Sequence, residues 1–385
     1  MGAHILILGG GSGGLVAANK LAKALRGRGH TITVVDRSPY HYFQPSFPWV
    51  ALGFKEPEEV RRPLHNLEKK GVRFLQDEVE AILPEDKQVR LKENGTLAYD
   101  YLVVSLGAEL GPDLMPGFHL AHHPWSVEGA LKMREALTNF EGGRVVISVS
   151  GPYYRCPPAP FEVAGQLDFN FKARRIRSKT EIVVAHPNPA PLAGMGPAIS
   201  GLIMEILRNK NVRFEGNFNA ERIDPERKIL LARDGRELPF DLLVMVPPHR
   251  PNRLVQQLGP TTPQGFPVVD PETFRSVKYP EIFMIGDMVN PSLNLPPAGV
   301  VAHFQAEFVA NEIVAEVKGA YIGESFTPVA MCIMDFGDDA VLPMCDFTQI
   351  LTLEGPPSCG VLGRGKAVRV AKMLFESLWF ATLLN

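Results

Sequence analysis

Hydrophobic residues near the start of the chain change from the period of a strand to that of a helix and back again. Residues 5–8 form a short apolar run, residues 15–26 place apolar side chains at spacings of three and four, and residues 31–35 favour a second strand. Short apolar runs indicate buried strands, whereas spacings of three and four indicate an amphipathic helix. The pattern predicts a βαβ unit whose turn is the glycine-rich stretch 9–14.

A second series of elements follows a stretch rich in proline and aromatic residues at 39–65, which predicts loops with short helices. Residues 72–104 alternate like strands, and a helix is expected around 126–140. A strand at 145–149 opens another α/β block. The elements predicted after it are strands at 181–185, 212–214, 228–232 and 242–246, a helix at 199–209, a strand at 282–285 and a helix at 301–318.

The charge balance and the cysteines exclude two classes of partner. The chain has 385 residues with 40 basic and 42 acidic side chains, so its formal net charge is −2. Nucleic-acid binders usually carry a basic excess, so we expect no nucleic-acid partner. The four cysteines form no CxxC pair, so we expect no metal site.

Neither a secretory signal nor a membrane span is expected. Strand-like residues begin at His4 without a basic and apolar leader ahead of them, and no run of about 18 apolar residues occurs. We therefore expect a protein on the cytoplasmic side, in solution or bound peripherally to a membrane surface.

The turn after the first strand has the spacing of a dinucleotide-binding motif. Gly9, Gly11 and Gly14 satisfy GxGxxG, and Asp36 ends the second strand. Glycines let the backbone turn tightly and approach a pyrophosphate at the helix N-terminus, while an acid at that strand end suits a ribose hydroxyl. The unit therefore predicts a dinucleotide site.

Two later segments favour FAD. Residues 101–108 (YLVVSLGA) and 282–287 (IFMIGD) each end a strand in a glycine turn. With the glycine motif they resemble flavoproteins that have two dinucleotide-binding domains, in which the glycine-aspartate pair meets the ribityl and phosphate region of the flavin. The residues predicted to bind FAD are Gly9, Gly11, Ser12, Gly13, Gly14, Asp36, Arg37, Gln44, Pro45, Val79, Ser105, Gly107, Gly286, Asp287 and Pro297.

This resemblance implies an α/β fold with two tandem Rossmann-like domains, as in glutathione reductase, and a C-terminal α+β extension. Residues 1–113 and 242–318 are assigned to a discontinuous FAD-binding domain, and residues 114–241 to a second domain. Residues 319–385 form the extension, which offers a membrane, quinone or dimer surface. We also expect a homo-oligomer.

The second domain lacks a glycine motif at the corresponding turn. After the strand at 145–149 the chain reads SGPYYRCPPAP, so Tyr153, Tyr154 and Arg155 stand where a pyrophosphate would need bare backbone. We therefore expect no nicotinamide cofactor at this position.

Four segments resemble sulfide:quinone oxidoreductases and flavocytochrome c sulfide dehydrogenases. The more specific are CPPAPFE at 156–162 and QPSFPWVALG at 44–53, and the others are LPPAGVVAH at 295–303 and AMCIMDFG at 330–337. The resemblance runs from the first strand to beyond residue 375.

The resemblance implies that Cys156 and Cys332 flank the flavin ring. Hydrosulfide would open a disulfide or trisulfide between them and form a persulfide on one cysteine, and the freed thiolate would pass two electrons to FAD. Cys156 precedes a predicted helix at 159–172, whose dipole favours a thiolate. Glu162 would accept or donate a proton. A quinone would then accept the electrons.

Some features depart from the family pattern. Residues 114–126 contain no cysteine, so FAD is predicted to be bound non-covalently. Pro297 stands where the family has a lysine, and residues 191–198 lack the family's histidine. Cys345 and Cys359 are interpreted as structural or incidental.

The terminal helix at 366–384 is amphipathic. One face is expected to hold Lys366, Arg369, Lys372 and Glu376, and a broad apolar surface carries aromatic side chains. A basic helix of this kind suits a membrane interface through which a quinone enters. Packing against the protein itself or a dimer partner is the alternative.

The resemblance thus implies an FAD-dependent oxidoreductase that passes electrons from sulfide, or another small sulfur compound, to a quinone. Three alternatives stay open: a type II NADH:quinone dehydrogenase, a flavocytochrome-type sulfide dehydrogenase, and a flavin-binding sulfur carrier or sensor without turnover. The departures from the family pattern motivate the carrier, while the chain shows no CxxCH motif for a haem.

Overall fold

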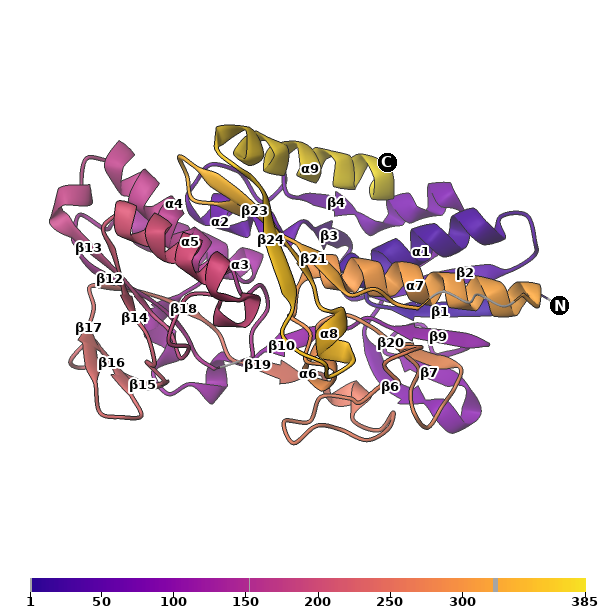
Figure 1. The fold of residues 1–385 in the computed structure, drawn as a ribbon. Helices are drawn as coiled ribbons and strands as arrows, with labels where there is room; N and C mark the ends of the chain where they lie inside the picture. The colour runs from indigo at the N-terminus through magenta and orange to yellow at the C-terminus, as the bar shows by residue number, and fades with distance from the viewer. Residues whose placement is uncertain (1, 152, 321–324) are drawn as a thin grey trace.

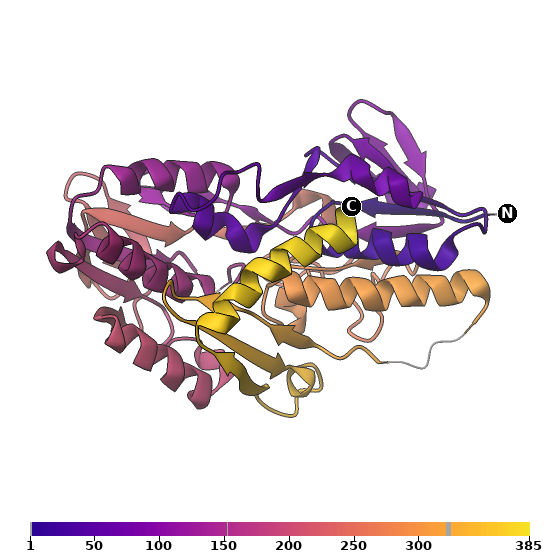
Figure 2. The ribbon, with the colours of Figure 1, turned by 90° about the horizontal axis from the view of Figure 1, so that it is seen from above.

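The computed structural model describes residues 2–151, 153–320 and 325–385, which form two α/β domains with an antiparallel sheet and a long terminal helix lying across them (Figure 1). The first domain contains a five-stranded parallel sheet with the order β20-β9-β1-β2-β5. Helices α1 and α7 lie side by side against it (Figure 2). These elements are β1 (His4–Leu8), α1 (Ser12–Leu25), β2 (Thr31–Asp36), β5 (Arg73–Gln76), β9 (Tyr101–Val104), β20 (Ile282–Met284) and α7 (Gly299–Lys318).

The second domain repeats this architecture with the parallel strand order β11-β18-β12-β13-β14. Its strands are β11 (Ala121–His122), β12 (Gly143–Val149), β13 (Thr180–Ala185), β14 (Val212–Glu215) and β18 (Leu242–Val246), and its helices are α3 (Val127–Thr138), α4 (Ala159–Ala173) and α5 (Pro197–Asn209). The predicted fold class, with two Rossmann-like domains in tandem, is confirmed.

One predicted domain boundary is wrong. The predicted boundary places β18 with residues 242–318 in the FAD-binding domain, but the strand lies between β11 and β12 in the second sheet. The chain returns to the first domain only after Val246, where β19 (His249–Pro251) pairs with β10 (Ala108–Leu110). All five residues of β18 are buried, so their apolar run fits a central position in either parallel sheet and does not identify the partner strands.

Short elements fill the connections. Two three-stranded antiparallel sheets comprise β6 (Val79–Leu83), β7 (Gln88–Leu91) and β8 (Thr96–Ala98), and β15 (Ala220–Asp224), β16 (Ile229–Ala232) and β17 (Glu237–Pro239). The region 39–65 contains β3 (Tyr40–Tyr42), α2 (Phe47–Ala51) and β4 (Arg61–Pro63), and α6 (Asn290–Leu293) precedes α7. Short 3₁₀ helices lie at Gln44–Ser46, Leu64–Lys70, Pro84–Asp86, Pro112–Leu114, Phe118–Leu120, Arg177–Lys179, Ala193–Met195 and Arg253–Val255.

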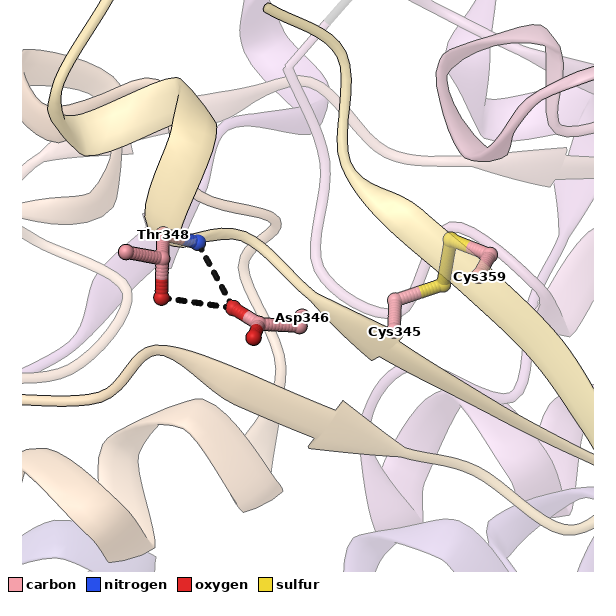
Figure 3. The surroundings of a disulfide bond; sticks show 4 residues. All are labelled: Cys345, Asp346, Thr348 and Cys359. Carbon is pink, nitrogen blue, oxygen red and sulfur yellow. Dashed lines mark hydrogen bonds between the residues drawn. A yellow bond between two sulfur atoms is a disulfide. The ribbon is translucent and has the colours of Figure 1, made fainter. Parts of the chain in front are cut away.

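The C-terminal extension forms an antiparallel sheet around β23, followed by the terminal helix α9 (Figures 1 and 2). Its elements are β21 (Val329–Met331), β22 (Met334–Asp335), β23 (Ala340–Asp346), α8 (Thr348–Leu351), β24 (Ser358–Arg364) and α9 (Lys366–Leu384). Cys345 and Cys359 stand directly opposite each other on β23 and β24 and form a disulfide (Figure 3). The residue pattern does not predict this pairing, because it depends on the strand register.

The extension is packed onto both domains. Helix α9 contributes four side chains to the hydrophobic core of the first domain: Trp379, Phe380, Leu383 and Leu384. The extension contributes three to the core of the second domain: Met334, Phe336 and Val341. In the described part of the chain, no helix combines the length and apolar character that a bilayer crossing requires.

Candidate active site

The turn between β1 and α1 leaves bare backbone where a phosphate group would lie. A Cβ atom on Gly14 would stand 1.9 Å from the carbonyl oxygen of Gly9, and one on Gly9 would stand 2.3 Å from that of Ser105. A Cβ atom on Gly11, the N-cap of α1, would meet nothing within 4 Å. Two glycines therefore permit close packing, and the third borders open space at a helix N-terminus, where an anion is stabilised.

Two carboxylates lie at strand ends beside this turn. Asp36 accepts hydrogen bonds from the N–H groups of Gly10 (2.6 Å) and Ser38 (2.8 Å), and burial raises its pKa despite them. Oδ1 of Asp287 is buried and has no hydrogen-bond partner within the described ranges. An unsatisfied buried acceptor fits a hydroxyl donor on a bound cofactor. These residues thus fit the ribose, pyrophosphate and ribityl groups of FAD.

The other residues predicted to contact FAD lie in several kinds of element. Gly286, whose φ of 85° suits glycine, donates its N–H to Oε1 of Gln305 at 2.7 Å and so directs the chain toward Asp287. The remaining ones lie in loops or at helix starts: Arg37, Gln44, Pro45, Ser105, Gly107, Pro297, Ser12 and Gly13. Val79 lies in β6 and packs into the hydrophobic core, so its contact with FAD stays a prediction.

Cys156 and Cys332 meet although 176 positions separate them in the chain. Cys156 lies in the loop between β12 and α4, where its N–H donates to the carbonyl oxygen of Pro297 at 2.8 Å. Cys332 follows β21, and its N–H donates to the carbonyl oxygen of Pro343 at 3.3 Å. Both are free thiols, and they lie close enough for each to shift the pKa of the other. Because the loop of Pro297 also starts α7, the thiol pair lies beside the predicted flavin position.

The two thiols differ in acidity. The hydrogen bond from Cys332 lowers the pKa of Cys156, against the opposing effects of burial and of the nearby Glu162. The same contact raises the pKa of Cys332, and burial raises it further. Cys156 is therefore the group that carries negative charge first as the pair loses a proton.

A buried ion pair lies next to the thiols. Glu162, in the first turn of α4, contacts Nζ of Lys372 from α9, and each side chain is only 4% exposed. Gln166 Nε2 also donates to Glu162 Oε1 at 3.1 Å. Burial raises the pKa of Glu162 to about 7, although Lys372 opposes this shift. A carboxyl group with this pKa can exchange protons near neutral pH.

Trp49 and Asp335 enclose the ion pair. Nζ of Lys372 lies 5.4 Å from the centroid of the Trp49 ring, whose Nε1 donates to Oδ2 of Asp335 at 2.9 Å. Arg369 Nε donates to the other oxygen of Asp335 at 3.1 Å. The segment 44–53, which contains Trp49, is thus joined to the C-terminal helix and the thiol site.

Part of the polar face predicted for α9 turns toward the protein. Lys372 and Glu376, expected on one face with Lys366 and Arg369, are 4% and 5% exposed. Glu376 pairs with Lys55 at 2.5 Å and accepts a hydrogen bond from Ser46. Helical periodicity identifies two faces but not which one meets the protein. Here Glu162 and Lys55 offer partners that keep Lys372 and Glu376 buried.

The face that α9 turns outward is apolar. Its exposed side chains, with their exposed fractions, are Val370 (54%), Met373 (50%), Leu374 (59%), Phe375 (49%) and Leu378 (64%). Val361 and Leu362 of the preceding strand are also exposed, at 44% and 56%. Contiguous exposed apolar side chains mark a surface that meets another apolar phase or a partner.

The edge of the second sheet that would receive a nucleotide is filled by side chains. Tyr153 donates its hydroxyl hydrogen to the carbonyl oxygen of Asp287, and Tyr154 OH lies 2.9 Å from His186 Nε2. Arg155 Nη2 donates to the carbonyl oxygen of Trp125 at 2.6 Å. Sequence reasoning missed Lys372, Trp125 and the partners of Arg155, because only the fold brings these distant segments together.

Comparison with known proteins agrees with this arrangement. Residues 3–306 match the family model of pyridine nucleotide-disulphide oxidoreductases. The chain is 26% identical over 365 residues to the sulfide-quinone reductase of Aquifex aeolicus, with 88% of this chain and 83% of that protein covered. It is 25% identical over 312 residues to the mitochondrial sulfide:quinone oxidoreductase of Mus musculus, with 78% and 68% covered.

Two further matches define the range of similarity. The crystal structure of the sulfide:quinone oxidoreductase from Aquifex aeolicus superposes with a TM-score of 0.86 at 24% identity, covering 100% of this chain and 92% of that one. An alternative NAD(P)H-ubiquinone oxidoreductase of Arabidopsis thaliana is 25% identical over 404 residues, with 92% and 75% covered.

Proposed function

This chain belongs to the pyridine nucleotide-disulphide oxidoreductase family, and from that membership we propose that it oxidises sulfide, or another small sulfur compound, through Cys156 and Cys332. The electrons pass through FAD to a quinone. As an FAD-dependent oxidoreductase the protein needs a donor close to the flavin, and the contact of the two thiols beside Pro297 carries the proposal. Similarity to sulfide-quinone reductases over most of both chains supports the same donor.

The difference in thiol acidity sets the direction of the reaction. The two thiols would first be oxidised to a disulfide, with their two electrons taken up by the flavin, when bound, and their two protons released. Hydrosulfide then attacks the sulfur of Cys332, and the Cys156–Cys332 bond breaks. Cys156 leaves as a thiolate because its pKa is the lower of the two, and Cys332 holds the persulfide. Joining the persulfide and the thiolate as a trisulfide then releases one proton and two electrons. FAD, when bound, supplies the two-electron acceptor.

Glu162 is the proposed acceptor of that proton. Its carboxylate lies close enough to both cysteines to raise their pKa values, and its own pKa is about 7. The ammonium group of Lys372 keeps the carboxylate available by favouring its charged form.

The exposed apolar face of α9 supports a quinone as the final acceptor. Lys372 projects from this helix toward the thiols, while Met373, Leu374 and Phe375 face outward one turn or less away. We propose that this face lies on a membrane surface, from which a quinone reaches the protein. The location on the cytoplasmic side stays a prediction.

The second candidate, a type II NADH:quinone dehydrogenase, has a specific observation in its favour, because the Arabidopsis relative covers 92% of this chain. The filled edge around Tyr153 and Tyr154 argues for the sulfur donor instead, since a pyrophosphate needs bare backbone there.

One experiment separates the two candidates. The FAD-loaded protein is mixed anaerobically with sulfide or with NADH, and the absorbance of the oxidised flavin is followed. The sulfur pathway predicts bleaching by sulfide and none by NADH. Bleaching by NADH alone would overturn it, and bleaching by neither would favour a sulfur carrier without turnover.

A further inference from the structure

Two side chains, those of Trp125 and His249, converge on Arg155, the residue that precedes Cys156. Arg155 follows β12, Trp125 lies beyond the end of β11, and His249 begins β19, which follows β18 in the chain. These strands are neighbours in the parallel sheet, with the order β11-β18-β12. In doubly wound folds, the carboxyl ends of the strands form the edge where ligands bind. Here that edge holds Trp125, Arg155 and His249.

Arg155 and Trp125 are joined by two reciprocal hydrogen bonds. Nε1 of Trp125 donates to the carbonyl oxygen of Arg155 at 2.9 Å, and Nη2 of Arg155 donates to the carbonyl oxygen of Trp125 at 2.6 Å. Trp125 is 5% exposed and packs in a small apolar cluster with Val149 and Tyr154, against which Cys156 also packs. The position of the Arg155 peptide group is therefore fixed by a bulky and buried side chain.

His249 holds the other side of the same residue. The N–H of Arg155 donates to Nε2 of His249 at 3.3 Å, while Nδ1 of His249 lies 2.9 Å from the carbonyl oxygen of Pro247. A carbonyl oxygen only accepts, so Nδ1 carries the proton and Nε2 is free to accept. Burial lowers the pKa of His249 to about 3, which keeps the imidazole neutral.

The conformation of Cys156 shows why such support is needed. Its φ is 62°, in the left-handed region that side chains with a Cβ atom rarely adopt. Such a residue persists only where its surroundings fix it. Its N–H bonds to Pro297 and its carbonyl oxygen accepts from the N–H of Ala159 at 2.9 Å, so all four backbone polar groups of Arg155 and Cys156 have partners.

We propose that Trp125, Arg155 and His249 form a clamp that holds the strained backbone of Cys156 and thereby positions its thiol against Cys332 and the flavin. The clamp occupies the edge where a nucleotide would otherwise dock, so this domain positions a reactive thiol in place of a second cofactor. The three are positioning residues, because they act through the backbone of Cys156. This inference rests on the proposed function in taking Cys156 as the reactive thiol.

Trp125→Phe tests the clamp by removing one N–H while retaining a buried aromatic ring. The pH dependence of Cys156 alkylation, read by peptide mass spectrometry, should shift toward that of an ordinary cysteine. The rate of flavin bleaching by sulfide should fall by about tenfold, since small misplacements of reacting groups have effects of this order or more. Unchanged alkylation and unchanged bleaching in a folded, FAD-loaded variant would overturn the proposal.

Two matched comparisons keep the test specific. Arg174→Met is the control, because Arg174 donates to the carbonyl oxygens of Leu137 (2.7 Å) and Phe140 (2.6 Å) at the other end of α4, and its loss should affect stability only. His249→Gln keeps an acceptor for the N–H of Arg155, whereas His249→Leu removes it, so only the leucine variant should shift the alkylation profile. A shift of equal size in both variants would contradict the clamp.

The alkylation readout also separates this inference from the proposed function. If sulfide fails to bleach the wild-type flavin, the sulfide pathway is wrong, yet the Cys156 profile still reports whether the clamp controls the thiol. If sulfide bleaches the flavin and Trp125→Phe leaves both measurements unchanged, the pathway stands and the clamp is wrong.

Discussion

Each Rossmann-like domain has an edge formed by the carboxyl ends of its parallel strands, and the two edges differ in the side chains that they hold. In the first, Gly9, Gly11 and Gly14 keep side chains out of the turn between β1 and α1. In the second, the turn after β12 holds Tyr154 and Cys156, both packed into a small apolar cluster. The first edge therefore has room for a cofactor, while the second supplies a thiol.

This difference shows how one fold accommodates two tasks. A parallel sheet ends its strands at one edge, so loops from distant parts of the chain meet there whatever they contain. Glycines at that edge leave backbone N–H groups free for phosphates, whereas bulky residues convert the edge into a support for one reactive side chain. Function is thus decided by a few residues on a shared architecture.

The largest expected effect comes from exchanging glycine for alanine at the two edges. Gly14→Ala places a methyl group 1.9 Å from the carbonyl oxygen of Gly9, so we expect FAD affinity to fall by about a hundredfold or more. Gly151→Ala, after β12, meets nothing within 4 Å and should leave FAD affinity unchanged. Flavin content after purification and titration of the apoprotein with FAD measure both. Equal losses of FAD affinity in the two variants would contradict the proposed difference between the two edges.

The second effect concerns Lys372, the cation that α9 places against Glu162 next to the two thiols. Lys372→Met leaves Glu162 buried without its cation, so we expect the free energy of unfolding to fall by about 3–5 kcal/mol. The change raises the pKa of Glu162 further. The wild type already binds the proton below its pKa of about 7, so the additional loss of stability grows as pH rises above about 7, where only the folded variant still binds it. Urea unfolding at several pH values measures it. Arg227→Met, from an exposed pair with Glu237, should leave the urea unfolding curve nearly unchanged.

The third effect distinguishes the two cysteine pairs. Cys345 and Cys359 close a loop with a sequence separation of 14, so replacing both by serine should lower the free energy of unfolding by about 2–4 kcal/mol. Flavin bleaching by sulfide should continue, because this disulfide ties β23 to β24 and has no part in the proposed transfer. Loss of bleaching in a folded double variant would assign the pair a chemical role.

The smallest effect is a shifted titration. Burial raises the pKa of Glu162 to about 7, so its carboxyl is protonated below this value and accepts protons above it. Infrared difference spectra between the wild type and Glu162→Gln should show a carboxyl band that disappears with a midpoint near 7. Bleaching by sulfide should also be slower in Glu162→Gln, because the proton then lacks this acceptor. A midpoint at the ordinary carboxyl value would remove Glu162 as the proton acceptor.

The sequence predicts the glycine-lined edge of the first domain well. It predicts the edge of the second domain, which holds Cys156, only in part. The βαβ unit and the fold class follow from local periodicity and glycine spacing. The sheet that receives β18 does not, because a fully buried run fits either sheet. The contacts of Lys372 and Trp125 were missed for a related reason, since each depends on segments that are distant along the chain.

The orientation of α9 is another feature that depends on the fold and not on the local pattern. The pattern identifies an amphipathic helix with the correct ends, but Lys372 and Glu376 turn inward because Glu162, Lys55 and Ser46 offer buried partners. Similarly, the disulfide between Cys345 and Cys359 depends on a strand register that composition does not encode. Chemistry at a site is thus readable from motifs, whereas its supporting partners require the fold.

The most direct test of the central claim is the anaerobic rate of flavin bleaching by sulfide in the wild type and in Cys156→Ser, with Cys359→Ser as the matched cysteine control. If the second edge supplies the electron-donating thiol, the wild type and Cys359→Ser bleach at similar rates, and Cys156→Ser retains its FAD but does not bleach. Bleaching of Cys156→Ser at the wild-type rate would contradict the account.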